Sequence, residues 1–269
     1  MKENLFILAN TTKSLFGIGD YIRIMSVINN LNFKKIYWLS NEILLPIARD
    51  TKFFFKVDNI KYLKNYDVKN SFVINCYECG INGDGKYFLG NLFKNKKVND
   101  KKNTEKFVTK LMNFFSVKNY QVFSSKKKYL YEKNKILFGW HAPNKWKKKE
   151  MPMRKWKQLE KKLKKNYEIN IEYQNHNKGL KELISQIKSS EFVITIVSLV
   201  AHLSALYNKK TILLSGPTIF SEYHKINNLK LVRPSLKLTC KKCIINKKIN
   251  NCICMNNIDI NKIIKNFKN

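Results

Sequence analysis

An acidic residue beside two glycines is the first candidate for chemistry in this sequence. Gly17, Gly19 and Asp20 come shortly after the apolar run Leu5–Ala9, which is typical of a buried strand in a parallel sheet. Glycines at a strand–helix junction let the backbone approach a ligand, and a helix N-terminus offers its N–H groups to an anion. The dinucleotide fingerprint is absent, because its third glycine position holds Ile22. Asp20 is therefore either a helix-capping carboxylate or a functional acid at the N-terminus of the helix.

The cysteines are the second group of candidates. Four of them have the spacing C-x2-C-x8-C-x-C, which is close to that of a zinc site and comprises Cys240, Cys243, Cys252 and Cys254. The C-x-C pair is tighter than in zinc fingers, so we favour packed thiols or an oxidisable pair over a structural metal. Cys76 and Cys79 follow a predicted strand, and we interpret them as loop residues and not as a redox motif. Because no export signal is apparent, we expect thiols or a metal site here and not disulfides.

The composition indicates a globular protein with a strongly basic surface. The 269 residues are 44% hydrophobic and carry a formal net charge of +33. Such a charge can indicate nucleic acid, anionic lipid or a charged substrate as partner. Lysine and asparagine are abundant along the whole chain, however, and the basic block 145–165 has no aromatic-interleaved nucleic-acid motif. With no signal peptide and no apolar run of roughly 20 residues, we expect a cytoplasmic protein.

The elements that must position these residues alternate between strand and helix. In the first half, strands are predicted at residues 5–9, 35–39, 53–57 and 71–75, and helices at 20–31, 41–49 and 104–115. Residues 79–90 form a predicted glycine-rich loop, and residues 118–135 are the best candidate for a linker.

The same alternation continues in the second half. Strands are predicted at residues 135–140, 168–173, 192–197, 210–215 and 229–232, and helices at 152–165, 180–189, 199–207 and 259–267. This order favours two doubly wound α/β domains, 1–130 and 131–269, that face a cleft. Ligands of such domains bind outside the carboxyl ends of the strands. Asp20, His141 and Gly216 all follow predicted strands, so we expect them at a shared site.

Several segments, in the same order along the chain, resemble family 9 glycosyltransferases, the ADP-heptose:lipopolysaccharide heptosyltransferase group. A helix that ends at a strand, a helix with a His-Leu pair, and a strand that runs into Gly-Pro-Thr resemble the donor-binding core of that family, here at 184–194, 201–206 and 209–218. Three more segments are similar to family motifs: Gly19-Asp20, His141-Ala142-Pro143 with the Trp156 helix, and the cysteine segment that ends at Ile258.

The resemblance implies a GT-B fold, in which two Rossmann-like domains face a central cleft. The N-terminal domain would take the acceptor and the C-terminal domain a nucleotide-diphosphate sugar. It also implies inverting, metal-independent transfer of a heptose-like sugar to a lipopolysaccharide-type or other glycan acceptor, without a cofactor. Asp20 matches the catalytic base, and Gly17, Gly19 and Arg23 fall in the acceptor-side loop. The matching donor-binding residues are His141, Lys145, Ser198, His202, Gly216, Pro217 and Thr218.

Two other functions stay open. The family usually has Asp and Gly shortly before its His, where this chain has Val197 and Leu199. A non-catalytic sugar- or nucleotide-binding protein of GT-B shape is therefore the first alternative. A nucleic-acid-binding protein rests on charge alone and ranks last. For a glycolipid acceptor, the positive surface would favour peripheral contact with anionic lipid at the inner membrane face.

Overall fold

The structure is a computed structural model that describes residues 4–11, 17–51, 53–68, 71–76, 108–109, 111–113, 115–118, 125, 129–217, 228–234 and 253–268. The chain divides into two compact units, Met1–Lys127 and Lys128–Asn269. Among the described residues, no helix is both long enough and apolar enough to cross a membrane.

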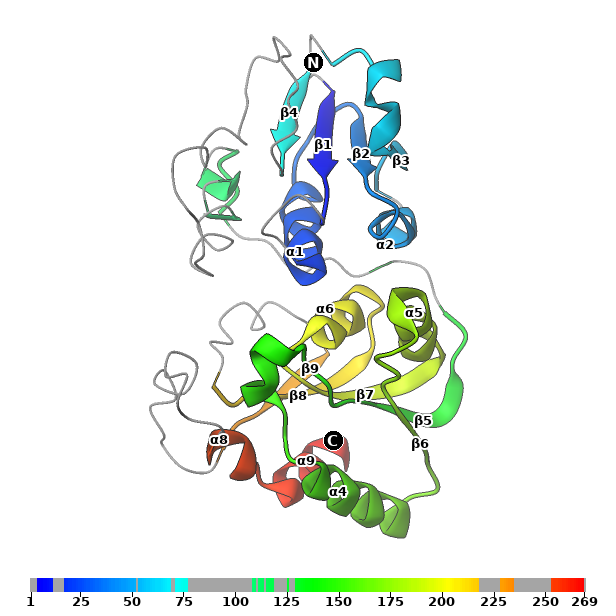
Figure 1. Ribbon diagram of the computed structural model, residues 1–269, viewed down its shortest axis with the longest axis vertical. Coiled ribbons are helices and arrows are strands. Elements are labelled where there is room, and N and C mark those ends of the chain that lie inside the picture. Colours follow the sequence, from blue (N-terminus) through cyan, green and yellow to red (C-terminus); the bar gives the residue numbers. More distant parts are fainter. Residues whose placement is uncertain are drawn as a thin grey trace. The chain divides into compact units, whose positions relative to one another are not determined.

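The first unit is built on a parallel sheet with the strand order β3-β2-β1-β4 (Figure 1). Its described strands are β1 (Leu5–Ala9), β2 (Ile36–Ser40), β3 (Lys56–Asn59) and β4 (Phe72–Asn75). The connections between them contain α1 (Ile18–Ile28), α2 (Leu45–Thr51) and the 3-10 helix η1 (Ile60–Asn65).

Strand β1 is buried on both faces, which explains its continuous apolar run. Phe6 and Leu8 lie on the face where Ile60 and Leu63 of η1 pack. On the opposite face, the ring of Tyr21 in α1 meets Trp38 edge-on, with centroids 6.2 Å apart. Alternate residues of a strand point to opposite faces, so a strand covered on both sides needs apolar residues at every position.

The strand predicted at residues 53–57 is wrong in position. The structure begins β3 at Lys56, directly after Phe55, whose N–H donates to the carbonyl of Ile36 (2.8 Å). The rings of Phe53 and Phe54 contact each other at an angle of 45°, and Phe54 packs on Trp38 with centroids 5.1 Å apart. Phe53 and Phe54 therefore pack against a neighbouring strand, and only Phe55 makes a backbone hydrogen bond to β2 just before β3 begins.

The second unit contains a five-stranded parallel sheet with the order β6-β5-β7-β8-β9. The strands are β5 (Glu132–Gly139), β6 (Asn170–Tyr173), β7 (Ser190–Ile196), β8 (Lys210–Leu214) and β9 (Leu229–Val232). The described helices are η3 (Asn144–Lys149), α4 (Met153–Asn166), α5 (Gly179–Ser189), α6 (Leu199–Leu206), α8 (Ile253–Asn256) and α9 (Ile260–Lys268). Helices α5 and α6 cover one face of this sheet, and α4 and α9 cover the other (Figure 1).

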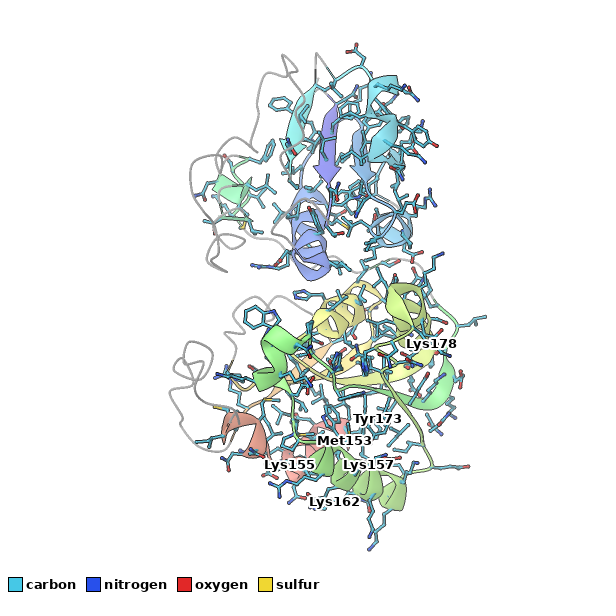
Figure 2. The ribbon with its side chains drawn as sticks, viewed as in Figure 1. Met153, Lys155, Lys157, Lys162, Tyr173 and Lys178 are labelled. Carbon is cyan, nitrogen blue, oxygen red and sulfur yellow. The ribbon has the colours of Figure 1, made fainter. Side chains whose placement is uncertain are left out.

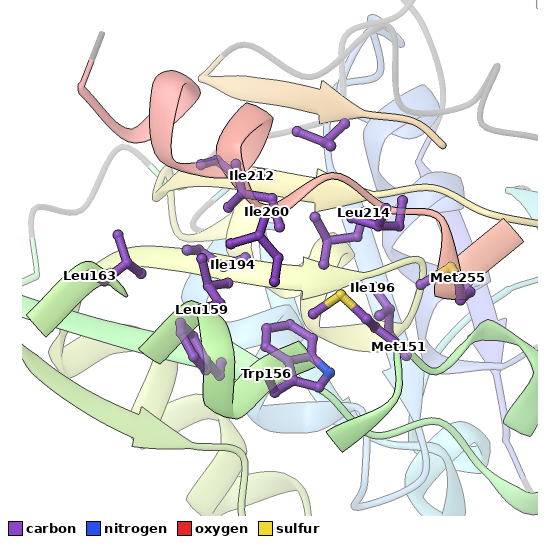
Figure 3. Close-up of a cluster of buried hydrophobic side chains, with 14 of the residues drawn as sticks. Met151, Trp156, Leu159, Leu163, Ile194, Ile196, Ile212, Leu214, Met255 and Ile260 are labelled. Atoms are coloured by element: carbon purple, nitrogen blue, oxygen red, sulfur yellow. The ribbon is translucent and has the colours of Figure 1, made fainter. Parts of the chain in front are cut away.

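Helix α4 shows how the basic block 145–165 is used. Lys155, Lys157 and Lys162 extend from α4, and Tyr173 comes from the nearby strand β6 (Figure 2). The opposite side of α4 buries Trp156, Leu159 and Leu163 against the sheet (Figure 3). An apolar stripe at helical spacing with charge on the remaining surface is the pattern of an amphipathic helix. Most lysines of this block therefore belong to a solvated face.

The elements predicted in the second half agree with the structure, except at their ends. Strand β5 begins three residues before the predicted strand, and α8 and η3 lie in segments for which no helix was predicted. Helix η3 and the segment after it occupy the predicted polar loop 141–150. In the first half, the predicted loop 79–90 and half of the predicted helix 104–115 lie outside the described residues.

Candidate functional site

Each sheet has a point where the chain changes direction. The first two connections after β1 lead outward to β2 and β3, and the chain then returns to the other side of β1 as β4. In the second sheet the corresponding point lies between β5 and β7. Ligands of doubly wound sheets bind at such points, outside the carboxyl ends of the strands. Asp20 follows β1, and His141 and Ser198 follow β5 and β7, so the structure places these three predicted residues at the two crossover points.

Asp20 is a half-buried residue in the first turn of α1. Its Oδ2 accepts a hydrogen bond from the backbone N–H of Gly17, the N-cap residue, over 2.9 Å. This is the bond by which the third helical residue satisfies an otherwise orphaned N–H. One carboxylate oxygen therefore caps the helix, while Oδ1 has no hydrogen bond within the described part of the chain. The capping role is observed, and it leaves the second oxygen available for proton transfer.

The predicted acceptor-side loop is partly wrong. Gly19 and Arg23 belong to helix α1, and Arg23 is only 6% exposed, so neither is a loop residue. Only Gly17 lies outside the helix, where it is exposed. The end of β1 is instead tied to α1 by Tyr21, whose hydroxyl donates to the carbonyl of Asn10 (3.2 Å) and lies 3.1 Å from the Asn10 backbone nitrogen. This pair fixes the start of the connection that leads to Asp20.

In the second unit, the crossover point is closely packed around Gly139. A Cβ atom added there would overlap the Thr195 side chain and lie 2.8 Å from Cγ1 of Val200. Thr195 Oγ1 donates to the carbonyl of Gly139 over 3.0 Å and lies 3.5 Å from the hydroxyl of Ser198. Glycine is required here because the end of β5, the end of β7 and the start of α6 approach each other closely.

A cluster of four polar or aromatic side chains follows β5 and β6. His141 Nδ1 lies 3.1 Å from Oε1 of Glu150, and the same oxygen accepts the backbone N–H of Ala142 (2.9 Å). The rings of His141 and His176 stack with centroids 4.0 Å apart, and Trp140 meets His176 edge-on at 5.4 Å.

The charge state of His141 follows from these neighbours. Partial burial lowers the pKa of His141, and the neighbouring His176 and Lys147 add to that effect, while Glu150 opposes it. At neutral pH the ring is therefore uncharged. Since an ionised carboxylate only accepts hydrogen bonds, Nδ1 carries the ring proton and donates it to Glu150. Nε2 then has a lone pair, and it makes no hydrogen bond within the described residues.

The lysines of η3 differ in their exposure. Lys147 is exposed and acts electrostatically on His141. Lys149 is 8% exposed, and its ammonium lies 4.8 Å from the centroid of the Trp146 ring. The side chain of Lys145 lies outside what the structure describes. Of the described lysines in this helix, Lys147 is thus the cation best placed to meet an anion near His141.

The remaining predicted donor residues lie at the ends of β7 and β8. Ser198 is the N-cap residue of α6, and half-buried His202 lies in the second turn of that helix. Gly216 and buried Pro217 follow β8, and a Cβ on Gly216 would collide with the Met255 side chain. Thr218 lies outside the described residues. The structure thus brings His141, Ser198 and Gly216 to one edge of one sheet.

Sequence reasoning missed four members of this edge. Glu150, His176, Thr195 and Gly139 were not among the predicted site residues. Gly139 had a recognisable signal, since a glycine at the end of a buried strand indicates close backbone approach. Glu150 and His176 had none, because their contacts with His141 join residues separated by 9 and 35 positions.

The expectation of thiols or a metal site over disulfides is wrong for Cys254. This residue is disulfide-bonded and buried in α8. Cys240, Cys243, Cys252 and Cys79 lie outside the described residues, and Cys76 is buried at the end of β4. Within the described part of the chain, no group of three or more His, Cys, Asp or Glu side chains is arranged to hold a metal ion.

Comparison with known proteins gives structural matches only. No protein-family model matches the chain, and no curated protein matches its sequence. A glycosyltransferase of family 9 from Veillonella parvula matches with a TM-score of 0.65 at 11% identity, covering 99% of this chain and 96% of that chain.

Two further solved structures are from E. coli. The ADP-heptose lipopolysaccharide heptosyltransferase II matches with a TM-score of 0.60 at 12% identity, covering 100% of this chain and 98% of that chain. Heptosyltransferase WaaC, solved with ADP, matches with a TM-score of 0.59 at 12% identity, covering 98% of this chain and 99% of that chain. The predicted fold class is confirmed: the chain has the two-domain, Rossmann-like fold of these glycosyltransferases.

Proposed function

We propose that the protein is an inverting, metal-independent glycosyltransferase that moves a heptose-like sugar from a nucleotide diphosphate to a lipopolysaccharide-type or other glycan acceptor. The observation that carries the proposal is the position of the motif residues. In a chain with the fold of heptosyltransferases, Asp20, His141 and Ser198 all lie at the crossover points of their sheets. Those points are where doubly wound sheets bind ligands.

In the proposed reaction, Asp20 is the general base. Its carboxylate takes the proton of an acceptor hydroxyl while that oxygen forms a bond to the anomeric carbon of the donor sugar. The bond between the anomeric carbon and the diphosphate breaks, and its electron pair leaves with the diphosphate. Attack from the face opposite the leaving group inverts the anomeric configuration. Such a base contributes about 10²–10⁴ in rate.

The second unit would bind the donor. Exposed Lys147 supplies a positive charge for the diphosphate, whose negative charge grows as the bond breaks. Ser198 at the N-cap of α6 offers a hydroxyl and the N–H groups of the first helical turn. WaaC has been solved with ADP, and we extend that class of ligand, a nucleoside diphosphate, to this chain. A glycolipid acceptor would bring the basic surface against anionic lipid.

The test is binding followed by turnover. Nucleotide sugars with different bases and sugars are added to the pure protein, and the one that raises the melting temperature most is identified. A ligand at 100 times its Kd stabilises the protein by about 2.7 kcal/mol. That compound is then incubated with glycan acceptors, and release of the nucleoside diphosphate is measured. Stabilisation by no nucleotide sugar would contradict the proposal.

A non-catalytic binding protein is the second candidate. It is favoured by Val197, which is 4% exposed and packs with Ala201 and Leu213 at the position where the family usually has Asp. An acid that contacts the donor is thereby replaced with an apolar core residue. This candidate predicts binding of the same nucleotide sugar without release of nucleoside diphosphate in the presence of any acceptor.

A further inference from the structure

We propose that His141 recognises a neutral hydrogen-bond donor of the nucleotide sugar, a hydroxyl or an amino group, and does not contact the diphosphate. The inference rests on the proposed function, since it assigns a role within the donor site. Among the predicted donor residues, His141 has its hydrogen-bonding capacity best defined by its neighbours.

Glu150 determines which ring nitrogen carries the proton. Its Oε1 lies 3.1 Å from Nδ1 of His141 and is held in place by the Ala142 N–H at 2.9 Å. The backbone on the other side is also fixed, because the His141 N–H donates to Oε1 of Gln174 over 3.4 Å. With Nδ1–H directed at Glu150, Nε2 can only accept. Glu150 is therefore a positioning residue that sets the tautomer of His141.

Electrostatics at the ring disfavour an additional positive charge. The charged and titratable groups around it come from two segments: Lys147 and the C-cap residue Glu150 from η3, and His176 after β6. The His176 ring is stacked on His141 at 4.0 Å, so protonation of both rings would place two like charges face to face. Glu150 alone opposes this. A ring that stays neutral attracts no phosphate through charge.

An unprotonated Nε2 also repels phosphate oxygen. Phosphate oxygens at neutral pH are acceptors, and two acceptors that face each other without a proton between them lose their hydration for no gain. Ribose hydroxyls, sugar hydroxyls and the amino groups of nucleobases are donors, and each can give a hydrogen bond to Nε2. The His141 side chain keeps 21% of its surface exposed, so a ligand has access to the ring.

The two possible roles predict opposite responses to pH. If Nε2 accepts a hydrogen bond, protonation of His141 at low pH abolishes that contact, and its contribution to affinity falls. If the ring contacts the diphosphate, protonation creates a charge pair, and its contribution rises. The sign of this change therefore separates the two roles without any knowledge of the sugar.

The experiment measures affinity by calorimetry at pH 8 and pH 5.5. ADP, GDP, UDP and CDP are compared first, and the tightest binder is carried forward together with inorganic pyrophosphate. In His141→Phe, which retains a ring for stacking on His176, we expect about three- to tenfold weaker nucleotide binding at pH 8. Pyrophosphate binding should not change, and the difference between the two proteins should shrink at pH 5.5.

A second variant leaves His141 in place. In Glu150→Leu, which is similar in size, no acceptor faces Nδ1, so the ring proton is free to move to Nε2. We expect weaker nucleotide binding than in wild type at pH 8, with the change of tautomer visible in the ¹⁵N shifts of the imidazole. Two analogues identify the group that Nε2 contacts: a 2′-deoxynucleotide and, for a purine base, the nucleotide without the exocyclic amino group. The analogue that lacks the recognised group should bind to wild type and His141→Phe with equal affinity.

Three outcomes would overturn the inference. Pyrophosphate affinity that falls in His141→Phe, or a difference that grows at pH 5.5, would assign the ring to the diphosphate. Unchanged nucleotide affinity in both His141→Phe and Glu150→Leu would remove His141 from the site. Absence of binding by any nucleoside diphosphate or nucleotide sugar would contradict the proposed function itself and the inference with it.

Discussion

The carboxyl ends of the two sheets use their polar residues differently. In the first unit, Asp20 and Tyr21 hydrogen-bond to the backbone of residues within 11 positions of themselves. In the second unit, side chains bond to groups on other strands and loops: Thr195 donates to the backbone carbonyl of Gly139, and His141 bonds to the side chain of Glu150. The bonds of Asp20 and Tyr21 are thus local, although Asn41 Nδ2 donates to Thr11 Oγ1 (2.9 Å) between the ends of β2 and β1. The second edge is held by several bonds between segments.

This difference indicates which edge is preorganised for binding. A network that joins several segments holds its side chains in fixed positions before a ligand arrives, and preorganised groups bind at a lower entropic cost. A single carboxylate that caps a helix needs no such network, because a general base requires only one oxygen near the proton that it takes. This contrast supports the proposed roles, with recognition of the donor in the second unit and proton transfer in the first.

Replacement of Asp20 is expected to have the largest effect. In Asp20→Asn, we expect turnover to fall by about 10²–10⁴, because the amide cannot take the acceptor proton. Nucleotide-sugar affinity should stay the same, since the donor is assigned to the other unit. Steady-state kinetics and calorimetry on the same preparation measure the two quantities. Unchanged turnover in Asp20→Asn would reduce this residue to a helix cap.

A matched pair of glycine variants tests how closely each edge is packed. In Gly139→Ala, the new Cβ collides with Thr195 and Val200, and we expect a loss of about 1–3 kcal/mol together with weaker nucleotide binding. In Gly17→Ala, the nearest atom to the new Cβ among the described residues is Oδ2 of Asp20 at 3.6 Å and φ is −78°, so the loss should stay below about 1 kcal/mol. Denaturant unfolding measures both.

Equal losses in the two glycine variants would contradict the contrast between the close contacts around Gly139 and the wider spacing of described atoms around Gly17. A Gly139→Ala variant that is destabilised but binds nucleotide normally would separate the packing of β5 and β7 from the donor site.

The fold could be predicted from the sequence because its signals are local. Buried parallel strands appear as continuous apolar runs, as in Leu5–Ala9, and amphipathic helices have apolar residues at helical spacing, as in α4. The strand at 53–57 was misplaced because an aromatic run satisfies the same pattern whether it joins the ladder or packs on Trp38. Local patterns cannot distinguish these two uses.

The resemblance predicted site residues whose roles stay predictions. Asp20 lies in the first turn of α1, the helix after β1, and His141 and Ser198 lie two residues beyond the ends of β5 and β7. The partners that set their chemistry were not predictable: the bond between His141 and Glu150 and the His141–His176 stack depend on how loops turn after the strands. The 3-10 geometry of η3, which brings Lys147 near His141, likewise has no signature in a run of lysines.

Each unit also has a carboxylate that accepts a hydrogen bond from a tyrosine and lies near a lysine, outside the candidate site residues discussed above. Glu160 accepts from Tyr173 (2.8 Å), Lys164 (2.9 Å) and Lys157 (3.1 Å). Partial burial acts to raise its pKa, but these hydrogen bonds lower the pKa of Glu160 to about 2. In the first unit, Asp58 accepts from Tyr66 (2.8 Å), and Lys56 lies farther away, at 4.0 Å. The hydrogen bond from Tyr66 lowers the pKa of Asp58.

Removal of these carboxylates is expected to have a moderate effect that depends on pH. A carboxyl group whose pKa is lowered on folding stabilises the protein above its unfolded value, near 4.5 for Glu160, and loses that contribution as pH falls toward 2. We expect Glu160→Gln to cost on the order of 1 kcal/mol at pH 7 and almost nothing at pH 2, and Asp58→Asn to cost less than about 0.5 kcal/mol. Urea unfolding at several pH values tests both, and a pH-independent cost for Glu160→Gln would contradict the charge-based account.

The smallest expected effect comes from adding a second cap at the N-terminus of α1. This variant tests whether Asp20 acts only through its capping hydrogen bond. In Gly17→Ser, the new hydroxyl can accept the backbone N–H of Asp20, while the Asp20 carboxylate continues to accept the N–H of residue 17. We expect a gain of a few tenths of a kcal/mol, or about 1 °C in melting temperature, measured by calorimetry. Combined with Asp20→Asn, the serine should restore most of the lost helix stability. Activity should stay low in the double variant if Asp20 is the base, whereas activity that returns together with stability would show that the carboxylate acts only by holding α1 in place.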